Sequence, residues 1–178
     1  MDRNLGATLV ADSITHSASY GDLYQWGRDS DGHQNRIFPD TTSILSTSDR
    51  PGHEAFIKVG IYYDWRSPSN DALWQGVNSI NNPCPAGYRL PTDVEWEAER
   101  ISWSSNDAAE AISSPLKLPL KGYREDQDGT LLDEGSEGYY WSSTVDGTYS
   151  RALFFASDDA GAYMNLRSFG NSLRSLKD

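Results

Sequence analysis

Three histidines and one cysteine are the residues of this chain best suited to acid–base, nucleophilic or metal chemistry. His16, His33 and His53 stand alone in polar segments, without His-x-x-x-His, Cys-x-x-Cys or Gly-x-Ser-x-Gly spacing. Isolated histidines of this kind are typical of exposed loops. Cys84 lies between two prolines, which favours a buried structural thiol over a nucleophile. The spacing therefore offers no catalytic constellation, and we expect a protein that is not an enzyme.

Carboxylates offer two further chemistries, an acid–base pair or a calcium site. Glu95, Glu97 and Glu99 alternate along one expected helix, which spreads them around it instead of bringing them together. Residues 124–134 gather five acidic side chains around a glycine turn, and calcium binds six to eight oxygens. That segment lacks the spacing of an EF-hand, so a hairpin turn at Asp128 between two strands is favoured over calcium. The sequence predicts no metal and no cofactor.

The clearest positioning element is a helix that begins after Pro91. Thr92 offers its hydroxyl to the first turn, and Glu95 completes a capping box with it. A helix of about three turns would place Trp96 on its buried side. A second, shorter helix is expected from residue 106 or 107 to residue 112, ending before a proline.

Aromatic and apolar runs predict at least three strands after these helices. The runs are Leu116–Gly122, Gly138–Ser143 and Arg151–Ala156, each bounded by turn residues. Pro119 places the first of them at an edge or at a bulge. A last strand near Ser172–Leu176 would close an antiparallel sheet.

The N-terminal half is expected to consist mainly of loops. Tyr20, Leu23, Tyr24 and Trp26 have the spacing of one side of a short helix and are predicted core. Residues 28–82 are rich in Asp, Ser, Pro and Gly, which predicts sparse regular structure. Aromatic residues are expected to pin these loops to the body, namely Phe38, Phe56, Tyr62, Tyr63, Trp65 and Trp74.

Length and composition predict one domain spanning residues 1–178. The 178 residues suffice for one sizeable core, to which six Trp, ten Tyr and five Phe contribute. Many glycines and prolines between these residues are typical of a loop-rich chain. The mixture fits an irregular α+β fold.

Charge and hydropathy narrow the range of partners. The net charge of −11, without a local basic cluster, argues against nucleic acid as a partner. No apolar run approaches the roughly 20 residues that cross a bilayer, so we expect no membrane insertion. The single cysteine excludes an internal disulfide. Met1 is not followed by a basic and then apolar segment, so no signal peptide is expected in this chain.

The segment Arg89–Arg100 resembles the signature of the formylglycine-generating-enzyme branch of the C-type lectin fold. Six short motifs follow one another along the chain: Met1–Ala7, Tyr20–Arg28, Trp74–Asn78, Asn82–Thr92, Gly122–Arg124 and Gly138–Thr144. In this order they resemble, more closely, the Fibrobacter succinogenes major paralogous domain. The resemblance covers nearly the whole chain and implies a small antiparallel sheet with two helices and long loops.

This resemblance implies a surface-exposed module outside the cell, on a cell or on a virion. The group includes the variable proteins of diversity-generating retroelements, whose C-terminal lectin-type region is diversified for ligand binding. The resemblance implies a variable region from about residue 141 to residue 178. It also implies that this region binds a protein, by protein–protein interaction, or another cell-surface ligand. Two alternatives stay open, an oxidase or hydroxylase of the formylglycine-generating type and a conserved structural cell-surface domain.

The same resemblance bears on the cysteine chemistry. Formylglycine-generating enzymes hold copper with two cysteines near the C-terminal end of the domain, and this chain lacks both. Relatives often carry a cysteine in the place of Ser175, where it would pair with the equivalent of Cys84. Residues 173–177 depart from that pattern, so that disulfide is not expected here.

The candidate ligand-binding residues lie between residue 144 and residue 171. Tyr, Asn, Ser and Asp are adaptable contact residues, and Tyr adds contact area at small entropic cost. An ordinary set of polar loops on the sheet would have a similar composition. The predicted binding residues are Thr144, Asp146, Thr148, Tyr149, Ser150, Asp158, Asp159, Tyr163, Asn165, Leu166, Ser168, Phe169 and Asn171.

Overall fold

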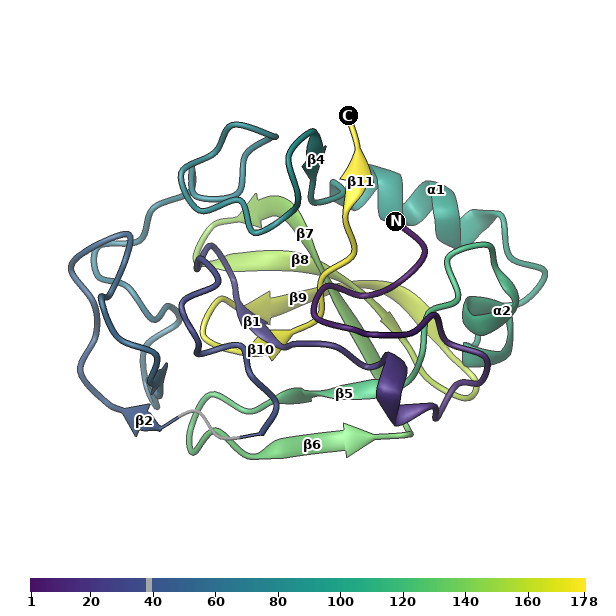
Figure 1. Ribbon diagram of the computed structural model, residues 1–178, viewed down its shortest axis with the longest axis horizontal. Helices are drawn as coiled ribbons and strands as arrows, with labels where there is room; N and C mark the ends of the chain where they lie inside the picture. Colours follow the sequence, from purple (N-terminus) through teal and green to yellow (C-terminus); the bar gives the residue numbers. More distant parts are fainter. Residues whose placement is uncertain (38–39) are drawn as a thin grey trace.

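A computed structural model describes residues 1–37 and 40–178 and has α+β architecture. Two helices lie beside a central seven-stranded sheet, and both termini lie on the same side of the molecule (Figure 1). The strand order is β1-β10-β5-β7-β8-β9, with β6 also paired to β5. The strands of this sheet are β1 (Tyr24–Gln25), β5 (Lys121–Arg124), β6 (Leu131–Glu134), β7 (Gly138–Asp146), β8 (Tyr149–Phe155), β9 (Ala160–Leu166) and β10 (Gly170–Asn171).

The sheet is mixed, so the prediction of an antiparallel sheet is wrong in one pair. β5 and β7 run parallel and meet at Gly122 and Gly138. The reason is the intervening strand, because β6 turns back along β5 and β7 then reverses direction once more. β7, β8 and β9 form an antiparallel meander, as the aromatic runs of β7 and β8 indicated.

Two predicted strands are displaced. Residues 116–120 are not a strand, because Leu118 N–H donates to the carbonyl of Ala111 and Leu120 N–H to that of Ile14. At the C-terminus, β10 joins the main sheet, whereas β11 (Leu176–Lys177) pairs with β4 (Tyr88–Arg89) in a separate two-stranded sheet. The chain therefore closes against the segment before the first helix.

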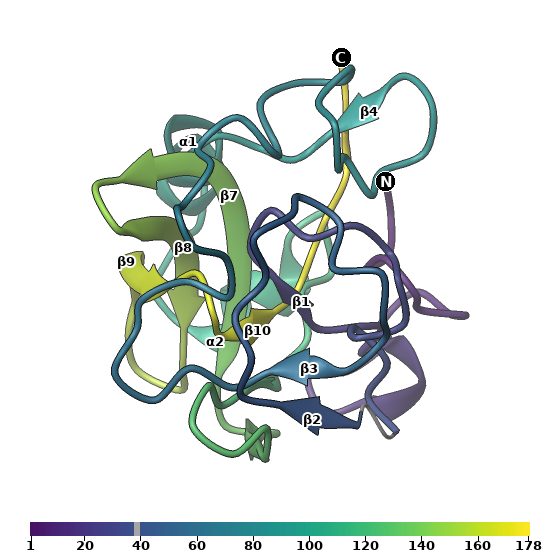
Figure 2. The ribbon, with the colours of Figure 1, turned by 90° about the vertical axis from the view of Figure 1, so that its left-hand side faces the viewer.

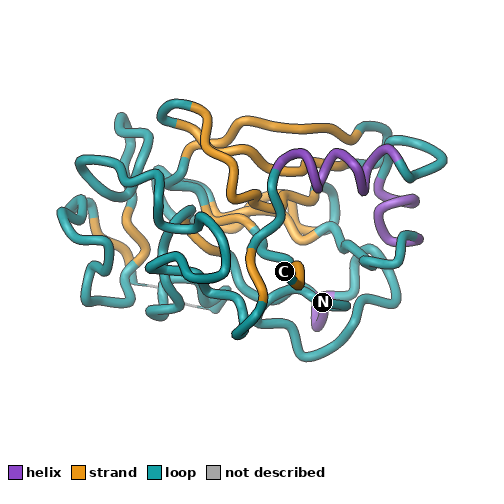
Figure 3. The backbone as a smooth tube through the Cα atoms, turned by 90° about the horizontal axis from the view of Figure 1, so that it is seen from above, coloured by secondary structure: helices purple, strands orange, loops and turns teal. Residues whose placement is uncertain are grey.

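The first helix, α1 (Asp93–Ile101), has the predicted cap. Thr92 Oγ1 accepts the Glu95 N–H at 3.3 Å, and the Glu95 carboxylate accepts the Thr92 N–H at 2.8 Å. Trp96 is buried, and its Nε1–H donates to the Trp141 carbonyl at 3.1 Å. The second helix, α2 (Ala108–Ser113), is capped by Asp107, which confirms its predicted start. Both helices lie next to each other at one end of the molecule, and loops fill the other end (Figure 3).

The segment from Tyr20 to Trp26 is core, as predicted, but it is not a helix. A single 3-10 turn, η1 (Ser17–Ser19), precedes it, and Gly21 then takes a left-handed φ of 67° that ends any helical path. Leu23 N–H donates to the Gln34 carbonyl, and Trp26 N–H donates to the Arg167 carbonyl. Long-range pairing therefore overrides the helical spacing.

Regular structure is sparse between residues 28 and 82, as the composition predicted. The described part of this segment holds two strands, β2 (Thr41–Thr42) and β3 (Phe56–Ile57), which pair in parallel. Figure 2 shows them beyond β1 and β10, on the side away from α1. Phe56, Trp65 and Trp74 are buried and pin the loops, whereas Tyr62 and Tyr63 are exposed, contrary to prediction. Phe38 lies outside the described residues.

Two cores lie on opposite sides of the meander. Trp96 packs on Tyr140 on the helix side, with Leu153 and Phe155 in the same cluster. On the other side Trp141 packs among loop tryptophans and donates from Nε1 to the Tyr24 carbonyl at 2.8 Å. The tryptophans thus use both their apolar surface and their N–H groups to hold loops on strands.

Candidate functional site

Five aromatic side chains gather on the face of the meander that points away from the helices, and we call them the aromatic cluster. They are Tyr123 on β5, Tyr139 on β7, Phe154 on β8, Tyr163 on β9 and Phe169 after β9. Ring centroids lie 5.2 Å apart for Tyr123 and Tyr139 and 5.1 Å apart for Tyr139 and Phe154. Tyr163 lies 5.8 Å from Tyr139, and Phe169 lies 5.5 Å from Tyr123.

Strand register explains why these rings meet. Tyr139 is opposite Phe154, and side chains alternate between the two faces of a strand. Tyr140 and Phe155 therefore point to the helices, while Tyr139 and Phe154 point the other way. Trp141 shares the face of Tyr139, but loops cover it completely. The loop layer thus covers one part of this face and leaves the aromatic cluster at its border.

The aromatic cluster surrounds a small cavity. It has a volume of about 100 Å³ and is lined by Tyr123, Tyr139, Tyr163, Asn165 and Phe169. Tyr163 is 48% exposed, while Asn165 is only 8% exposed. The Asn165 Oδ1 accepts the Leu166 N–H at 2.9 Å, and its Nδ2 has no hydrogen-bond partner among the described residues. Accessible aromatic side chains around a polar group are typical of a binding surface.

Carboxylates border the aromatic cluster. Tyr139 Oη donates to Glu137 Oε2 at 2.9 Å, and burial together with this bond raises the pKa of Tyr139. Burial also raises the pKa of Tyr123, as do the negative charges of Asp133, Glu137 and Glu125. Both phenols are therefore neutral at physiological pH, in a negative local potential.

The structure divides the predicted binding residues into accessible and buried groups. Tyr163, Asn165 and Phe169 meet at the cavity, and Asp158 and Asp159 are exposed in the β8–β9 turn. The accessible or half-buried members at the β7–β8 hairpin end are Thr144, Asp146, Thr148, Tyr149 and Leu166. The buried members are Ser150, Ser168 and Asn171, together with Asn165 at the cavity.

The hairpin end is tied to neighbouring elements. Thr144 Oγ1 accepts the Asp93 N–H at 2.9 Å, and the Tyr149 ring lies 5.6 Å from that of Tyr63. Arg151 Nε lies 3.5 Å from a carboxylate oxygen of Asp93 and 3.8 Å from one of Asp146. Thr144 therefore has a structural role, while Asp146 and Thr148 are exposed, Asp146 beside Arg151.

The buried polar residues serve the fold. Ser168 Oγ donates to Asp126 Oδ2 at 3.0 Å, and the Ser168 carbonyl accepts Gln25 Nε2–H at 2.8 Å. Ser150 and Asn171 have no exposed surface. They were predicted as ligand-binding residues because polar side chains are usually exposed. The local sequence does not indicate that they are buried.

The acidic segment after β5 forms the predicted hairpin. β5 and β6 pair across it, and Gly129 N–H donates to the Glu125 carbonyl. Protein groups occupy its carboxylates, because Asp128 accepts the Thr130 N–H and Asp126 accepts the Ser168 hydroxyl. In the described parts of the chain, no three His, Cys, Asp or Glu side chains converge as metal ligands.

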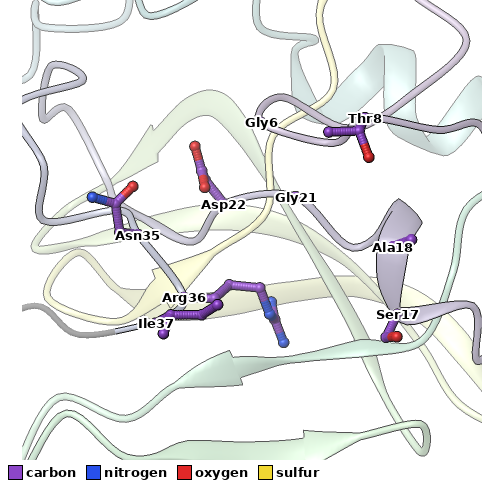
Figure 4. A pocket seen from close by; sticks show the side chains of 9 residues that line it. All are labelled: Gly6, Thr8, Ser17, Ala18, Gly21, Asp22, Asn35, Arg36 and Ile37. Carbon is purple, nitrogen blue, oxygen red and sulfur yellow. The ribbon is translucent and has the colours of Figure 1, made fainter.

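A larger hollow lies among the N-terminal segments (Figure 4). Its volume is about 350 Å³, and its charged members are Asp22 and Arg36. Arg36 is already engaged, because it donates to the Lys121 carbonyl at 2.8 Å and pairs with Glu134. None of the predicted binding residues lines this hollow, which makes the aromatic cluster the stronger candidate.

The histidine and cysteine predictions have different outcomes. His33 is fully buried, contrary to the prediction of an exposed histidine: its ring packs edge-on against Tyr24, its Nε2 accepts the Gln25 N–H, and its Nδ1 contacts Asp31 at 2.6 Å. Cys84 is half-buried, and burial raises the pKa of its thiol to about 11, an effect that the nearby Ser175 hydroxyl opposes. A thiol with that pKa is protonated at neutral pH, which fits a structural role.

Comparison of the chain with protein-family models, curated proteins and solved structures found no match. The described helices are all too short or too polar to span a bilayer.

Proposed function

We propose that this protein is a non-catalytic ligand-binding module with the C-type lectin fold, of the type found as variable proteins of diversity-generating retroelements. Its ligand is a protein or another cell-surface molecule, and the module is presented outside the cell, on a cell or on a virion. One observation carries the proposal, the accessible aromatic cluster at Tyr163 beside residues selected from the sequence. The resemblance of the sequence motifs to the variable proteins of diversity-generating retroelements also supports the proposal.

The fold suits ligand binding because the residues that stabilise it are buried, whereas the residues that could contact a ligand are exposed. Trp141 and its loop neighbours form the buried support, and Tyr163 stands at the surface of the same sheet face. Substitutions at exposed positions such as Asp146, Thr148 and Asp158 should change stability by only about 0.5 kcal/mol. The binding surface can therefore change while the fold remains.

Aromatic residues would contribute apolar contact area to ligand binding, and polar residues would orient the ligand. Tyr163 and Phe169 provide apolar area that loses little conformational entropy on binding. Asn165 lines the cavity, and its amide would orient a ligand by hydrogen bonding. Rings of this kind are the usual energetic centres of protein interfaces.

The two alternatives have weaker support. An oxidase or hydroxylase of the formylglycine-generating type would use paired thiols, whereas this chain has one cysteine with a raised pKa. A conserved structural domain would not need accessible rings beside an unpaired amide. The aromatic cluster therefore favours a binding module over both.

Sequencing of the encoding locus across a population tests the diversified form of this proposal. We expect a reverse transcriptase gene nearby and a template repeat matching codons from about Trp141 to Asp178. Substitutions should coincide with template adenines and fall at accessible positions such as Tyr163 and Asp146. A locus without a template, with these codons no more variable than those of Ser168 and Asn171, would overturn it.

A further inference from the structure

We propose that the aromatic cluster binds a lysine or arginine side chain presented by a protein partner. This inference rests on the proposed binding function and specifies its ligand chemistry. Three features of the cluster carry it: the arrangement of its rings, the charges around it and the size of its cavity.

The rings provide faces and edges around one small space. Tyr123 and Tyr139 meet nearly edge to face, with an interplanar angle of 75°, and Tyr139 and Tyr163 meet at 69°. A cation placed within about 6 Å of such rings is attracted by their negative faces, and the attraction is largest where water is excluded. Several rings at these angles can contact one cationic group together.

The charges beside the rings have one sign. Glu137 is bonded to Tyr139, and Asp133 and Glu125 act on Tyr123 along with it. Ion pairs within the described residues involve other carboxylates, such as Glu134 with Arg36. A positive ligand group would therefore gain both ring and carboxylate interactions without displacing a cation of the protein.

Five aromatic rings outside the cluster pair with cations of the chain itself. No ring of the aromatic cluster has such a cation among the described residues, although carboxylates lie beside Tyr139 and Tyr123. The five internal cation–ring pairs are Arg28 over Trp65, Arg36 over Tyr20, Lys121 over Tyr140, Arg124 over Phe56 and Arg167 over Trp26.

The cavity suits one side chain better than a large ligand. Its volume is about 100 Å³, compared with roughly 300–1,000 Å³ for pockets that enclose drug-sized molecules. Asn165 lines the cavity, and its amide would donate to an oxygen such as the backbone carbonyl beside the bound residue. The net charge of −11 would also accelerate the approach of a basic partner.

Titration with short peptides tests the inference. The probes are Ser-Gly-Lys-Gly-Ser, its arginine counterpart and its glutamine counterpart, all blocked at both ends. Side-chain NMR signals of Tyr139 and Tyr163 report binding. We expect saturable shifts with lysine and arginine, and about tenfold weaker binding of the glutamine peptide.

Matched variants locate the effect. Glu137→Gln retains an acceptor for Tyr139 Oη but removes the charge, so we expect about two- to fivefold weaker lysine binding. Tyr163→Ala removes an exposed ring and should weaken binding about tenfold. Glu54→Gln is the control, because Glu54 is an exposed carboxylate outside the cluster, and this variant should bind as the wild type does.

Specific results would overturn the inference. They are the absence of saturable shifts with both basic peptides, an equal response to the glutamine peptide, or equal losses in Glu137→Gln and Glu54→Gln. A neutral or acidic ligand whose binding requires Tyr163 would overturn the cationic assignment and leave the binding-module proposal standing. A diversified locus in a protein that binds neither basic peptide would likewise overturn the cationic ligand and leave the binding-module proposal standing.

Discussion

At the scale of single residues, buried polar side chains join segments that are distant in the sequence. Gln25 Nε2 donates to the carbonyls of Ile57 and Ser168, at 2.9 and 2.8 Å. Arg28 donates to the Gln25 amide oxygen and to the carbonyls of His53 and Ala55. Loops without regular structure gain their fixed positions from such bonds, and loss of one partner leaves a buried group unsatisfied.

His33 makes the stability of the fold depend on pH. Burial lowers the pKa of its imidazole to about 4, compared with about 6.5 in an unfolded chain. Between these values the unfolded chain binds the additional proton, so the free energy of unfolding should fall as the pH drops. The loss between about pH 6.5 and pH 4 should reach about 3 kcal/mol, measured by urea unfolding.

The control for this prediction is His33→Gln, which should lack the part of the pH dependence due to His33. NMR titration of the wild-type imidazole gives a second readout that does not depend on folding of the variant. A measured pKa above 6 for His33 would contradict the account. Protonation of Nε2 would break its bond with the Gln25 N–H, so this bond should help keep the pKa low.

Ser175→Cys should create a disulfide with Cys84. The Ser175 hydroxyl lies close enough to the thiol to influence its pKa, and the cross-link would close a long loop in the unfolded chain. We expect oxidation to remove both free thiols and to stabilise the protein by about 2–4 kcal/mol. Thiol titration and urea unfolding check this; two titratable thiols after oxidation would show that the side chains do not meet.

At the scale of elements, caps and anchors hold the sheet between its covering layers. Glu95 caps α1 and also pairs with Arg89, which in turn pairs with Asp178. These contacts join the helix start, β4 and the C-terminal end of the described chain. Glu95 and Arg89 together therefore link three segments.

Loss of the cap should destabilise the protein measurably. Thr92→Ala should lower the free energy of unfolding by about 1 kcal/mol. Glu95→Ala should cost more, because it also removes the pair with Arg89. Glu97→Ala is the control, since Glu97 forms only a partly exposed pair with Arg100, and its cost should stay below about 1 kcal/mol. Equal costs for Glu95→Ala and Glu97→Ala in urea unfolding would contradict this role.

Arg167 anchors the β7–β8 hairpin to the loops. It is fully buried, donates to the Gly147 carbonyl at 2.9 Å and lies 2.7 Å from an oxygen of Asp71. Arg167→Ala would leave buried Asp64 without the guanidinium 3.6 Å away, at a cost of about 3–5 kcal/mol. Arg151→Ala, at a more exposed site, is the control; a similar small loss for both variants would show that Arg167 is no anchor.

Local signals predicted the elements that depend on local chemistry. The caps at Thr92 and Asp107 predicted both helices, because capping involves residues three positions apart. β9 was not predicted, since Ala160, Gly161 and Ala162 have little strand preference and pair only because β8 lies beside them. Tertiary pairing, which a local pattern cannot represent, decides such segments.

At the scale of the whole molecule, the covering layers determine which part of the sheet is accessible. Helices cover one side of the meander, loops cover Trp141 on the other, and the aromatic cluster remains at the border. Of the binding residues predicted from the sequence, Tyr163, Asn165 and Phe169 line the cavity of this cluster. Tyr139 and Phe154 were predicted only as strand residues, and Tyr123 was not among the binding residues, because cross-strand register brings these rings together.

Binding to arrays of glycans and peptides is the most direct test of the binding-module account. Wild-type protein would be compared with Tyr163→Ala and with Val94→Ala, which removes an exposed apolar side chain on α1. The account predicts a ligand that Val94→Ala retains and that Tyr163→Ala, with unchanged unfolding, binds at least about tenfold more weakly. Ligands bound equally by all three proteins, or no saturable ligand in either class, would contradict it.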